Sequence, residues 1–173
     1  PKIIGTAPDL GALLSPSSES VSIEVQFSEP VNCSSADFTV TGGRRAGAWS
    51  TIPVPSNWEL HGFGTYKYGG PAPRPDEQGR YRHRFDVPRA WKGKRVDLVF
   101  EGSMTDTEAW IDGKLVGSKH QGGFYEFRYD VTKLLRFGTR QQLEVLVAKE
   151  SSNASVNGAE RHADFWIFGG IYR

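Results

Sequence analysis

Residues 153–170, NASVNGAERHADFWIFGG, gather carboxylates, a guanidinium group, amides and aromatic rings into a short stretch. We expect this stretch to form a loop and the strand that follows it, and loops at the ends of β-sandwiches commonly carry function. Ionised carboxylates accept strong hydrogen bonds, which suits a ligand rich in hydroxyl groups. Arg161 and Glu160 are therefore candidate ligand-binding residues, although an ion pair within the protein is an equally good interpretation.

Aromatic side chains form the second chemically useful group, because the apolar face of a sugar ring can stack on a flat ring. Tyr66 and Tyr68 lie in a Gly- and Pro-rich stretch, so we expect them to be exposed and name them as candidate binding residues. Trp110 lies within a predicted strand, and for it, Trp58 and Trp166 we favour packing in the core over contact with a ligand.

The sequence predicts no metal site and no catalytic residue. The histidines at 61, 83, 120 and 162 lack the spacings of zinc ligands, and a single cysteine, Cys33, excludes an internal disulfide. No loop has a dense acidic pattern, although a structural calcium ion (Ca2+) is compatible with the fold. His120 precedes two glycines, and we expect it to stabilise a turn by a hydrogen bond.

The composition and charge of the chain indicate which kinds of binding partner to expect. The chain has 173 residues, of which 38% are hydrophobic and 24% charged, and its net charge is +1. Basic residues alternate with acids, so no phosphate-neutralising surface is expected and nucleic acid is not a predicted partner. No apolar run reaches membrane-spanning length, and the N-terminus does not resemble a secretory signal. We favour an extracellular or periplasmic location, with a leader already removed.

The chain pattern predicts strands rather than helices. Apolar and polar residues alternate over residues 81–87, up to Pro88, as in a half-buried strand. Asp112-Gly113 between apolar flanks predicts a type I′ hairpin. Further strands are expected within the sequences RVDLVFEG, FYEFRYDVT and QLEVLVAKE and around STIPVP and DFWIFGG. About eight such strands predict an all-β, jelly-roll β-sandwich.

The stretch Gly42-Gly43-Arg44-Arg45 predicts a boundary between a small strand-rich segment, residues 1–45, and a sandwich domain, residues 46–173. Residues 21–27 alternate in polarity and predict a strand, which residues 38–40 continue. So short a segment cannot form a stable sandwich, so we expect its strands to pair with each other and lean on the larger domain. Its phrase VQFSEPVN resembles part of a bacterial immunoglobulin-like module.

Five motifs then occur in a fixed order: IPVPSNWELHGFG, GRYRHRFDVP, WKGKRVDLVFEG, AWIDGKLVGSKHQGGFYEFRYDVTKLL and DFWIFGGIYR. In this order they resemble the N-terminal, galactose-binding-like sugar-binding domain of family 2 glycoside hydrolases, which include β-galactosidases, β-glucuronidases and β-mannosidases. The resemblance implies that an immunoglobulin-like domain and a (β/α)8 barrel with both catalytic glutamates follow. A barrel needs about 250 residues, so the resemblance implies no complete active site in this chain.

The same resemblance singles out Asp164, in the pattern Asp-x-Trp-x-x-Gly-Gly-Ile. In the family this aspartate reaches into the barrel's pocket, binds the terminal sugar and, in some members, a cation such as Na+. The alternative is a carboxylate that anchors its own loop through backbone N–H groups. Some β-galactosidases also use an asparagine where this chain has Gly70 or its neighbours, which disfavours β-galactosidase specificity.

Three interpretations of function follow. The chain is an accessory domain of a retaining glycosidase, an autonomous carbohydrate-binding module, or a purely structural sandwich, since a fold alone does not fix a function. The first predicts carbohydrate and the immunoglobulin-like and barrel domains as partners. The second predicts that the chain binds polysaccharide by itself through exposed aromatic rings. The abrupt end of the sequence at Arg173 and the Asp164 motif favour the accessory domain.

Overall fold

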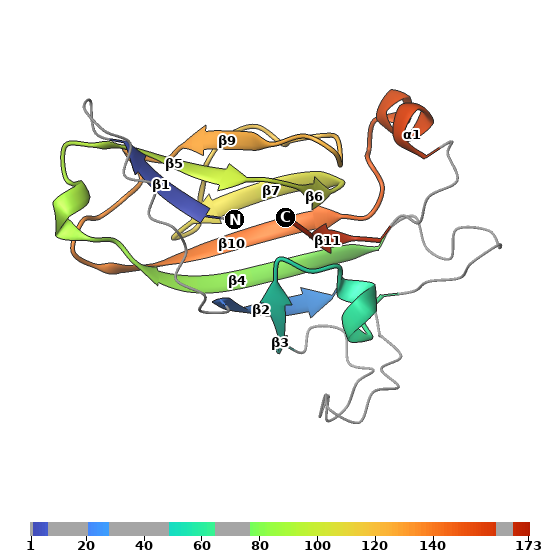
Figure 1. Ribbon diagram of the computed structural model, residues 1–173, viewed down its shortest axis with the longest axis horizontal. Helices are drawn as coiled ribbons and strands as arrows, with labels where there is room; N and C mark the ends of the chain where they lie inside the picture. Colours follow the sequence, from blue (N-terminus) through green and yellow to red (C-terminus); the bar gives the residue numbers. More distant parts are fainter. Residues whose placement is uncertain (1, 7–20, 28–48, 65–76, 162–167) are drawn as a thin grey trace.

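The computed structural model describes residues 2–6, 21–27, 49–64, 77–161 and 168–173. These residues form the layers of a β-sandwich (Figure 1), which confirms the predicted all-β fold class. One layer is a three-stranded antiparallel sheet in the order β1-β5-β9. Its strands are β1 (Lys2–Thr6), β5 (Arg95–Phe100) and β9 (Phe127–Asp130).

The second layer is a six-stranded antiparallel sheet in the order β3-β2-β4-β10-β7-β8. Its long central strands β4 and β10 run through the middle of the molecule (Figure 1). The strands are β2 (Val21–Phe27), β3 (Trp49–Val54), β4 (Gln78–Asp86), β7 (Asp106–Ile111), β8 (Lys114–Leu115) and β10 (Arg140–Ala148). A small pair, β6 (Ser103–Met104) and β11 (Gly170–Ile171), lies at one end.

The core lies between the two sheets, because each strand places alternate side chains on its inner face. In β10 the buried positions alternate with partly exposed ones, and in β4 Tyr81 is buried between the outward-facing Arg80 and the half-buried Arg82. The alternation predicted for residues 81–87 is confirmed. The core includes Ile52, Trp58, Tyr81, Val96, Leu98, Phe100, Ala109, Ile111, Leu143, Val145 and Val147.

The predicted hairpin and turn are also confirmed. Asp112 and Gly113 both have positive φ, 47° and 76°, as a type I′ turn requires, and they join the antiparallel strands β7 and β8. His120 Nε2 lies 2.9 Å from the carbonyl oxygen of Gly122, which is the turn-stabilising hydrogen bond expected of it. Its ring also stacks on Phe127, with the ring centroids 3.6 Å apart.

The strand predicted over residues 21–27 forms as β2, but its two neighbours are β3 and β4 and not another strand of residues 1–45, so the expected pairing within that segment is wrong for it. β1 pairs with β5 in the smaller sheet, and β2 lies between β3 and β4 in the larger one. Pairing with strands of the two larger sheets gives the backbone of β1 and β2 hydrogen-bond partners and a place in a packed sheet. A two-stranded unit on its own would be only marginally stable. The continuation at residues 38–40 and the predicted boundary stretch lie outside the described residues, and the boundary stays a prediction.

A helix occupies part of the stretch that we expected to be a loop. α1 (Ala154–Glu160) begins after Asn153, whose side chain accepts a hydrogen bond from the backbone N–H of Ser155. Two further short helical turns, η1 (Trp58–His61) and η2 (Arg89–Trp91), connect strands. Among the helices formed by the described residues, none is long and apolar enough to cross a membrane.

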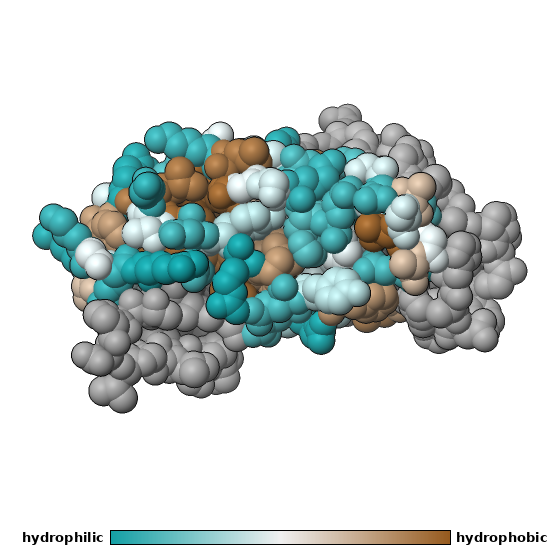
Figure 2. All heavy atoms as spheres, turned by 90° about the horizontal axis from the view of Figure 1, so that it is seen from above, coloured by the Kyte–Doolittle hydropathy of each residue, from teal (hydrophilic) through white to brown (hydrophobic). Residues whose placement is uncertain are grey.

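On the face seen in Figure 2, hydrophilic residues predominate and hydrophobic ones form small, separate groups. Such scattering is ordinary for a protein surface. The described large hydrophobic residues that are exposed are Leu60, Leu115, Phe124 and Tyr125.

Candidate functional site

Three consecutive residues before and in η1 surround the backbone of Gly169. The Asn57 side chain and the Trp58 backbone N–H both donate to the Gly169 carbonyl oxygen, at 3.4 and 3.1 Å. The Gly169 N–H donates to both carboxylate oxygens of Glu59, at 3.0 and 2.9 Å. We call Asn57, Trp58 and Glu59 the Gly169 clasp, because together they satisfy both backbone polar groups of that residue.

The clasp requires glycine at position 169. The Trp58 side chain is fully buried, and a Cβ atom built on Gly169 would lie 1.9 Å from Trp58 Cζ2. A Cβ on Gly79, in β4, would lie 2.5 Å from the same indole ring. Trp58 therefore packs between β4 and the residue that precedes β11, at positions where only glycine fits, and the core role that we favoured for it is confirmed.

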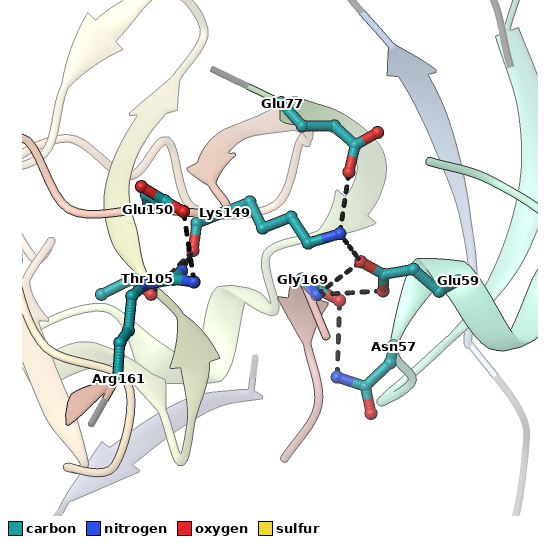
Figure 3. Close-up of polar contacts among 8 residues, drawn as sticks. All are labelled: Asn57, Glu59, Glu77, Thr105, Lys149, Glu150, Arg161 and Gly169. Atoms are coloured by element: carbon teal, nitrogen blue, oxygen red, sulfur yellow. Dashed lines mark hydrogen bonds and ion pairs between the residues drawn. The ribbon is translucent and has the colours of Figure 1, made fainter. Parts of the chain in front are cut away.

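The Glu59 carboxylate also belongs to a second arrangement, which we call the buried ion cluster and which consists of Lys149, Glu59 and Glu77. Lys149 follows the end of β10, and its Nζ lies 2.7 Å from Glu59 and 2.9 Å from Glu77 (Figure 3). The side chains of Lys149, Glu59 and Glu77 are only 7%, 3% and 6% exposed. Charges this deep are tolerated only when they are paired and hydrogen-bonded.

The buried ion cluster has two carboxylates for one ammonium group, so its charges do not balance when all three are ionised. Burial raises the pKa of the Glu59 carboxyl, although Lys149 and the Gly169 N–H act in the opposite direction. The raised pKa shows that desolvation outweighs these contacts. Glu59 therefore serves as a hydrogen-bond acceptor for Gly169 at a cost in solvation that the buried ion cluster only partly offsets.

The backbone of Lys149 holds a second segment on its other side. Its carbonyl oxygen accepts hydrogen bonds from Thr105 Oγ1, at 3.0 Å, and from the Arg161 guanidinium. Arg161 also lies 3.5 Å from the Glu150 carboxylate, and burial lowers its pKa. Figure 3 shows Arg161, Thr105 and Glu150 on the opposite side of Lys149 from Glu59 and Gly169.

Lys149 is thus connected to both described flanks of residues 162–167. On one flank Arg161 binds the Lys149 carbonyl oxygen, and on the other Gly169 binds Glu59, which is paired with the Lys149 ammonium. Asp164, which the sequence singles out, lies between these anchors and outside the described residues, as do Tyr66, Tyr68 and Trp166. The structure therefore describes how Arg161 and Gly169, on either side of that segment, are held.

The two charged candidates beside that segment have partners within the protein. Glu160 accepts hydrogen bonds from the Gly123 N–H at 2.9 and 3.1 Å. The ion pair that we weighed for Arg161 exists, with Glu150 as its partner. Tyr172 donates to the Gly123 carbonyl oxygen at 2.6 Å. Gly123 therefore connects Glu160, at the end of α1, with the C-terminal residues.

Sequence reasoning missed the buried ion cluster. Lys149 stands at the end of an apolar strand sequence, VLVAK. A lysine at the end of a strand is as compatible with a solvent-exposed side chain as with a buried one. Glu59 and Glu77 are 90 and 72 residues away along the chain, so no spacing pattern connects them. The one available signal was the presence of Glu59 inside the SNWELHGFG motif, directly after a tryptophan.

The described aromatic residues differ in their exposure to solvent. Trp58 is buried and Trp110 is half-buried in β7. Tyr125 lies in the sequence FYEFRYDVT, within which we expected a strand, but β9 begins only at Phe127, and Tyr125 is 64% exposed next to Phe124. Within the described residues no three metal-ligating side chains come together.

Comparison with known proteins identifies the family. Residues 44–173 match the model of the sugar-binding domain of glycosyl hydrolases family 2, and the chain belongs to this family. It is 32% identical over 93 residues to a β-galactosidase of Thermoanaerobacter pseudethanolicus, covering 54% of this chain and 12% of the relative. It is 29% identical over 154 residues to a β-galactosidase of Psychromonas ingrahamii, covering 83% and 14%.

Solved structures agree in fold. A calcium-binding mutant of Bacteroides uniformis β-glucuronidase 2 matches with a TM-score of 0.60 and 26% identity, covering 90% of this chain and 17% of that protein. A β-glycosidase from Bacteroides vulgatus matches the whole chain and 19% of its own length, with a TM-score of 0.59 and 23% identity, and supports the fold alone. The chain spans only 12–14% of the length of the β-galactosidases named above.

Proposed function

We propose that this chain is an accessory domain of a retaining family 2 glycosidase and that it lends Asp164 to a sugar pocket completed by a (β/α)8 barrel. The observation that carries the proposal is the anchoring of both flanks of residues 162–167 on Lys149. An anchored segment can present one side chain to a pocket at a reproducible position, which binding and catalysis both require.

The chemistry of the candidate residue agrees with this role. A carboxylate accepts hydrogen bonds from two neighbouring sugar hydroxyls, and such charge-assisted bonds are stronger than neutral ones. The relatives named above include β-galactosidases and a β-glucuronidase, so the proposed substrate class is a β-glycoside with free hydroxyls on its terminal sugar. In this proposal the two catalytic carboxylates of a retaining mechanism belong to the barrel.

The test is the kinetics of the full-length enzyme that carries this domain, with Asp164→Asn compared with the wild type. Hydrogen bonds to a charged group contribute about 1.5–3 kcal/mol, so we expect kcat/KM to fall by about 10- to 150-fold. Asp86→Asn is the matched control, since Asp86 is exposed and its ion-pair partner within the described part of the chain is the equally exposed Arg140. Equal kinetics for the Asp164 variant and the control would refute the role of Asp164.

A second candidate, an autonomous carbohydrate-binding module, is favoured by one observation: the side chain of Tyr125 is exposed next to that of Phe124. An exposed tyrosine ring can stack on a sugar. Calorimetric titration of the chain with galactose, glucuronic acid and a panel of soluble polysaccharides separates the two candidates. Saturable binding that Tyr125→Ala abolishes would establish the module, whereas a folded chain that binds none of them supports the accessory domain.

A further inference from the structure

We propose that one end of the sandwich binds an acidic polysaccharide, a polymer of sugars that carry carboxylate groups. The surface consists of residues 87–96, which connect β4 to β5, and residues 131–140, which connect β9 to β10; we call these two segments the basic end. Figure 1 shows both segments at the end of the molecule away from α1. The inference goes beyond the proposed function, because neither Asp164 nor a barrel takes part in it.

The two segments of the basic end lie side by side. The Val87 N–H donates to the Thr139 carbonyl oxygen at 3.0 Å, and the Gly138 N–H donates to the Val87 carbonyl oxygen at 2.6 Å. At the far end of the segments, the Val131 N–H donates to the Val96 carbonyl oxygen at 2.9 Å. The backbone therefore joins two distant parts of the sequence into one continuous surface.

Positive charge is concentrated at the basic end. It contains none of the 20 Asp and Glu residues of the chain, although the net charge of the whole chain is only +1. Of the 21 Lys and Arg residues it contains seven, namely Arg89, Lys92, Lys94, Arg95, Lys133, Arg136 and Arg140. All of these are exposed except Lys94, which is half-buried. Charges that are evenly mixed along most of the sequence are thus separated at this end of the fold.

Acids at the rim of the basic end compensate only part of its charge. The ion pairs are Arg140–Asp86, Arg136–Asp112, Arg95–Asp97 and Arg95–Asp130, with nitrogen–oxygen distances of 2.9, 2.8, 3.0 and 3.8 Å. Hydrogen bonds from Thr132 lower the pKa of Asp130, and the charges of Arg95 and Lys133 add to this shift. Seven cations therefore face four acids, which leaves an excess of three positive charges.

This excess fits a polyanion of low charge density. Duplex DNA carries one charge per about 1.7 Å, and proteins that bind it tightly contact about 6–10 phosphates. Closely spaced phosphates would also lie against the four rim acids. A carboxylated polysaccharide spaces its charges one per sugar ring and has hydroxyl groups between them. Those hydroxyl groups can donate to the rim carboxylates, while the carboxylates of the polymer pair with the cations.

An aromatic ring lies within the same surface. Trp91, in η2, is half-buried and packs against the core with part of its side chain. The part that stays open to solvent can contact the apolar face of a sugar ring. The exposed large hydrophobic side chains of the described residues lie outside the basic end, so this surface lacks the apolar anchor with which proteins bind membrane surfaces.

The test is calorimetric titration of the 173-residue chain with polygalacturonate, a polymer of a sugar acid, at about 50 and 200 mM salt. The methyl ester of the same polymer is the uncharged control. The test variant combines Lys92→Gln, Lys94→Gln and Lys133→Gln. Melting temperatures of all variants establish that each one is folded.

A matched control variant combines Arg80→Gln, Lys119→Gln and Arg128→Gln. These three cations are also exposed, and they lie outside the basic end. The control therefore changes the net charge of the chain by the same amount as the test variant. It separates binding at one surface from a general attraction between a polyanion and a cationic protein.

We expect polygalacturonate to bind and its methyl ester not to bind, with an affinity that falls as salt rises, since the contacts join exposed charges. The test variant should lose about 3- to 150-fold in affinity, the range for three exposed ion pairs. The control variant should lose about 2-fold or less, because its cations act only from a distance. Tyr125→Ala should leave this binding unchanged.

Three results would overturn the proposal. They are the absence of polygalacturonate binding by the folded chain, equal losses of affinity in the two triple variants, and a loss with Tyr125→Ala, which would assign the polysaccharide to the surface of the autonomous module. Tighter binding of a single-stranded DNA oligonucleotide, or of vesicles of phosphatidylcholine and phosphatidylserine, would also overturn it in favour of that ligand. The kinetics of Asp164→Asn test the proposed function separately.

Discussion

Two sets of ion pairs in this molecule have almost the same nitrogen–oxygen distances and opposite surroundings. Lys149 lies 2.7 and 2.9 Å from its two glutamates, and Arg140 binds both oxygens of Asp86 at 3.0 and 2.9 Å. The side chains of the buried ion cluster are at most 7% exposed, whereas those of Arg140 and Asp86 are 66% and 68% exposed. Distance alone would rank them as equals.

Solvent makes the difference between the two regions. Water screens the exposed pair and competes for its hydrogen bonds, so such pairs contribute little to stability. In the buried ion cluster the side chains are shielded from solvent, so the loss of Lys149 would leave two buried carboxylates uncompensated. The buried ion cluster also binds the N–H of Gly169 through Glu59, whereas Arg140 and Asp86 lie opposite each other at the paired ends of β10 and β4.

The largest expected effect is that of Lys149→Met. It leaves the carboxylates of Glu59 and Glu77 buried without their cation, and we expect the free energy of unfolding to fall by about 3–5 kcal/mol at pH 7. Urea denaturation followed by tryptophan fluorescence measures it. The loss should be smaller at acidic pH, because burial raises the pKa of Glu59 and protonation of Glu59 removes its charge from the pair of carboxylates. A loss no larger than that of an exposed pair would remove the contrast between the two regions.

Gly169→Ala comes next. The added methyl group would overlap the fully buried Trp58 ring, and we expect a loss of about 3 kcal/mol, the upper end of the usual cost of overpacking. Gly158→Ala is the control, because Gly158 lies in α1 with nothing within 4 Å of a built Cβ. Alanine there should stabilise the chain by about 0.5–1 kcal/mol. Similar thermal midpoints for the two variants would contradict the close packing of the clasp.

The smallest expected effect is that of Asp86→Asn. Its hydrogen bond with Arg140 lowers the pKa of Asp86, yet both side chains are open to water, so we expect a change in the thermal midpoint too small to resolve. Raising the salt concentration should affect the wild type and the variant alike. A clear drop in the midpoint would show that exposed pairs of good geometry matter here as much as buried ones.

Features encoded by neighbouring residues could be predicted from the sequence. The alternation over residues 81–87 gave a strand with a buried face, and Asp112-Gly113 gave a turn with two positive φ angles. Both depend on periodicity and on the backbone preferences of single residues. The ordered motifs likewise identified the family that the comparison then established.

The short helix α1 was not predictable in the same way. It has no apolar periodicity, contains Gly158 and is too short to be stable in isolation. Its described support is tertiary: Asn157 bonds to Ser151 through its side-chain oxygen and nitrogen, and Glu160 binds the Gly123 N–H. The partners of β1 and β2 were likewise fixed by which sheet edges the rest of the chain left open.

The sequence by itself therefore determined the strands with clear alternation, the hairpin and, through the ordered motifs, the family resemblance that made Asp164 the candidate sugar-binding residue. Only the tertiary structure decided that Lys149, Glu59 and Glu77 meet and that Gly169 is bound on both sides. The reason is physical: strand and turn signals come from residues a few positions apart, whereas burial and electrostatic pairing depend on segments that only the packed sheets bring together.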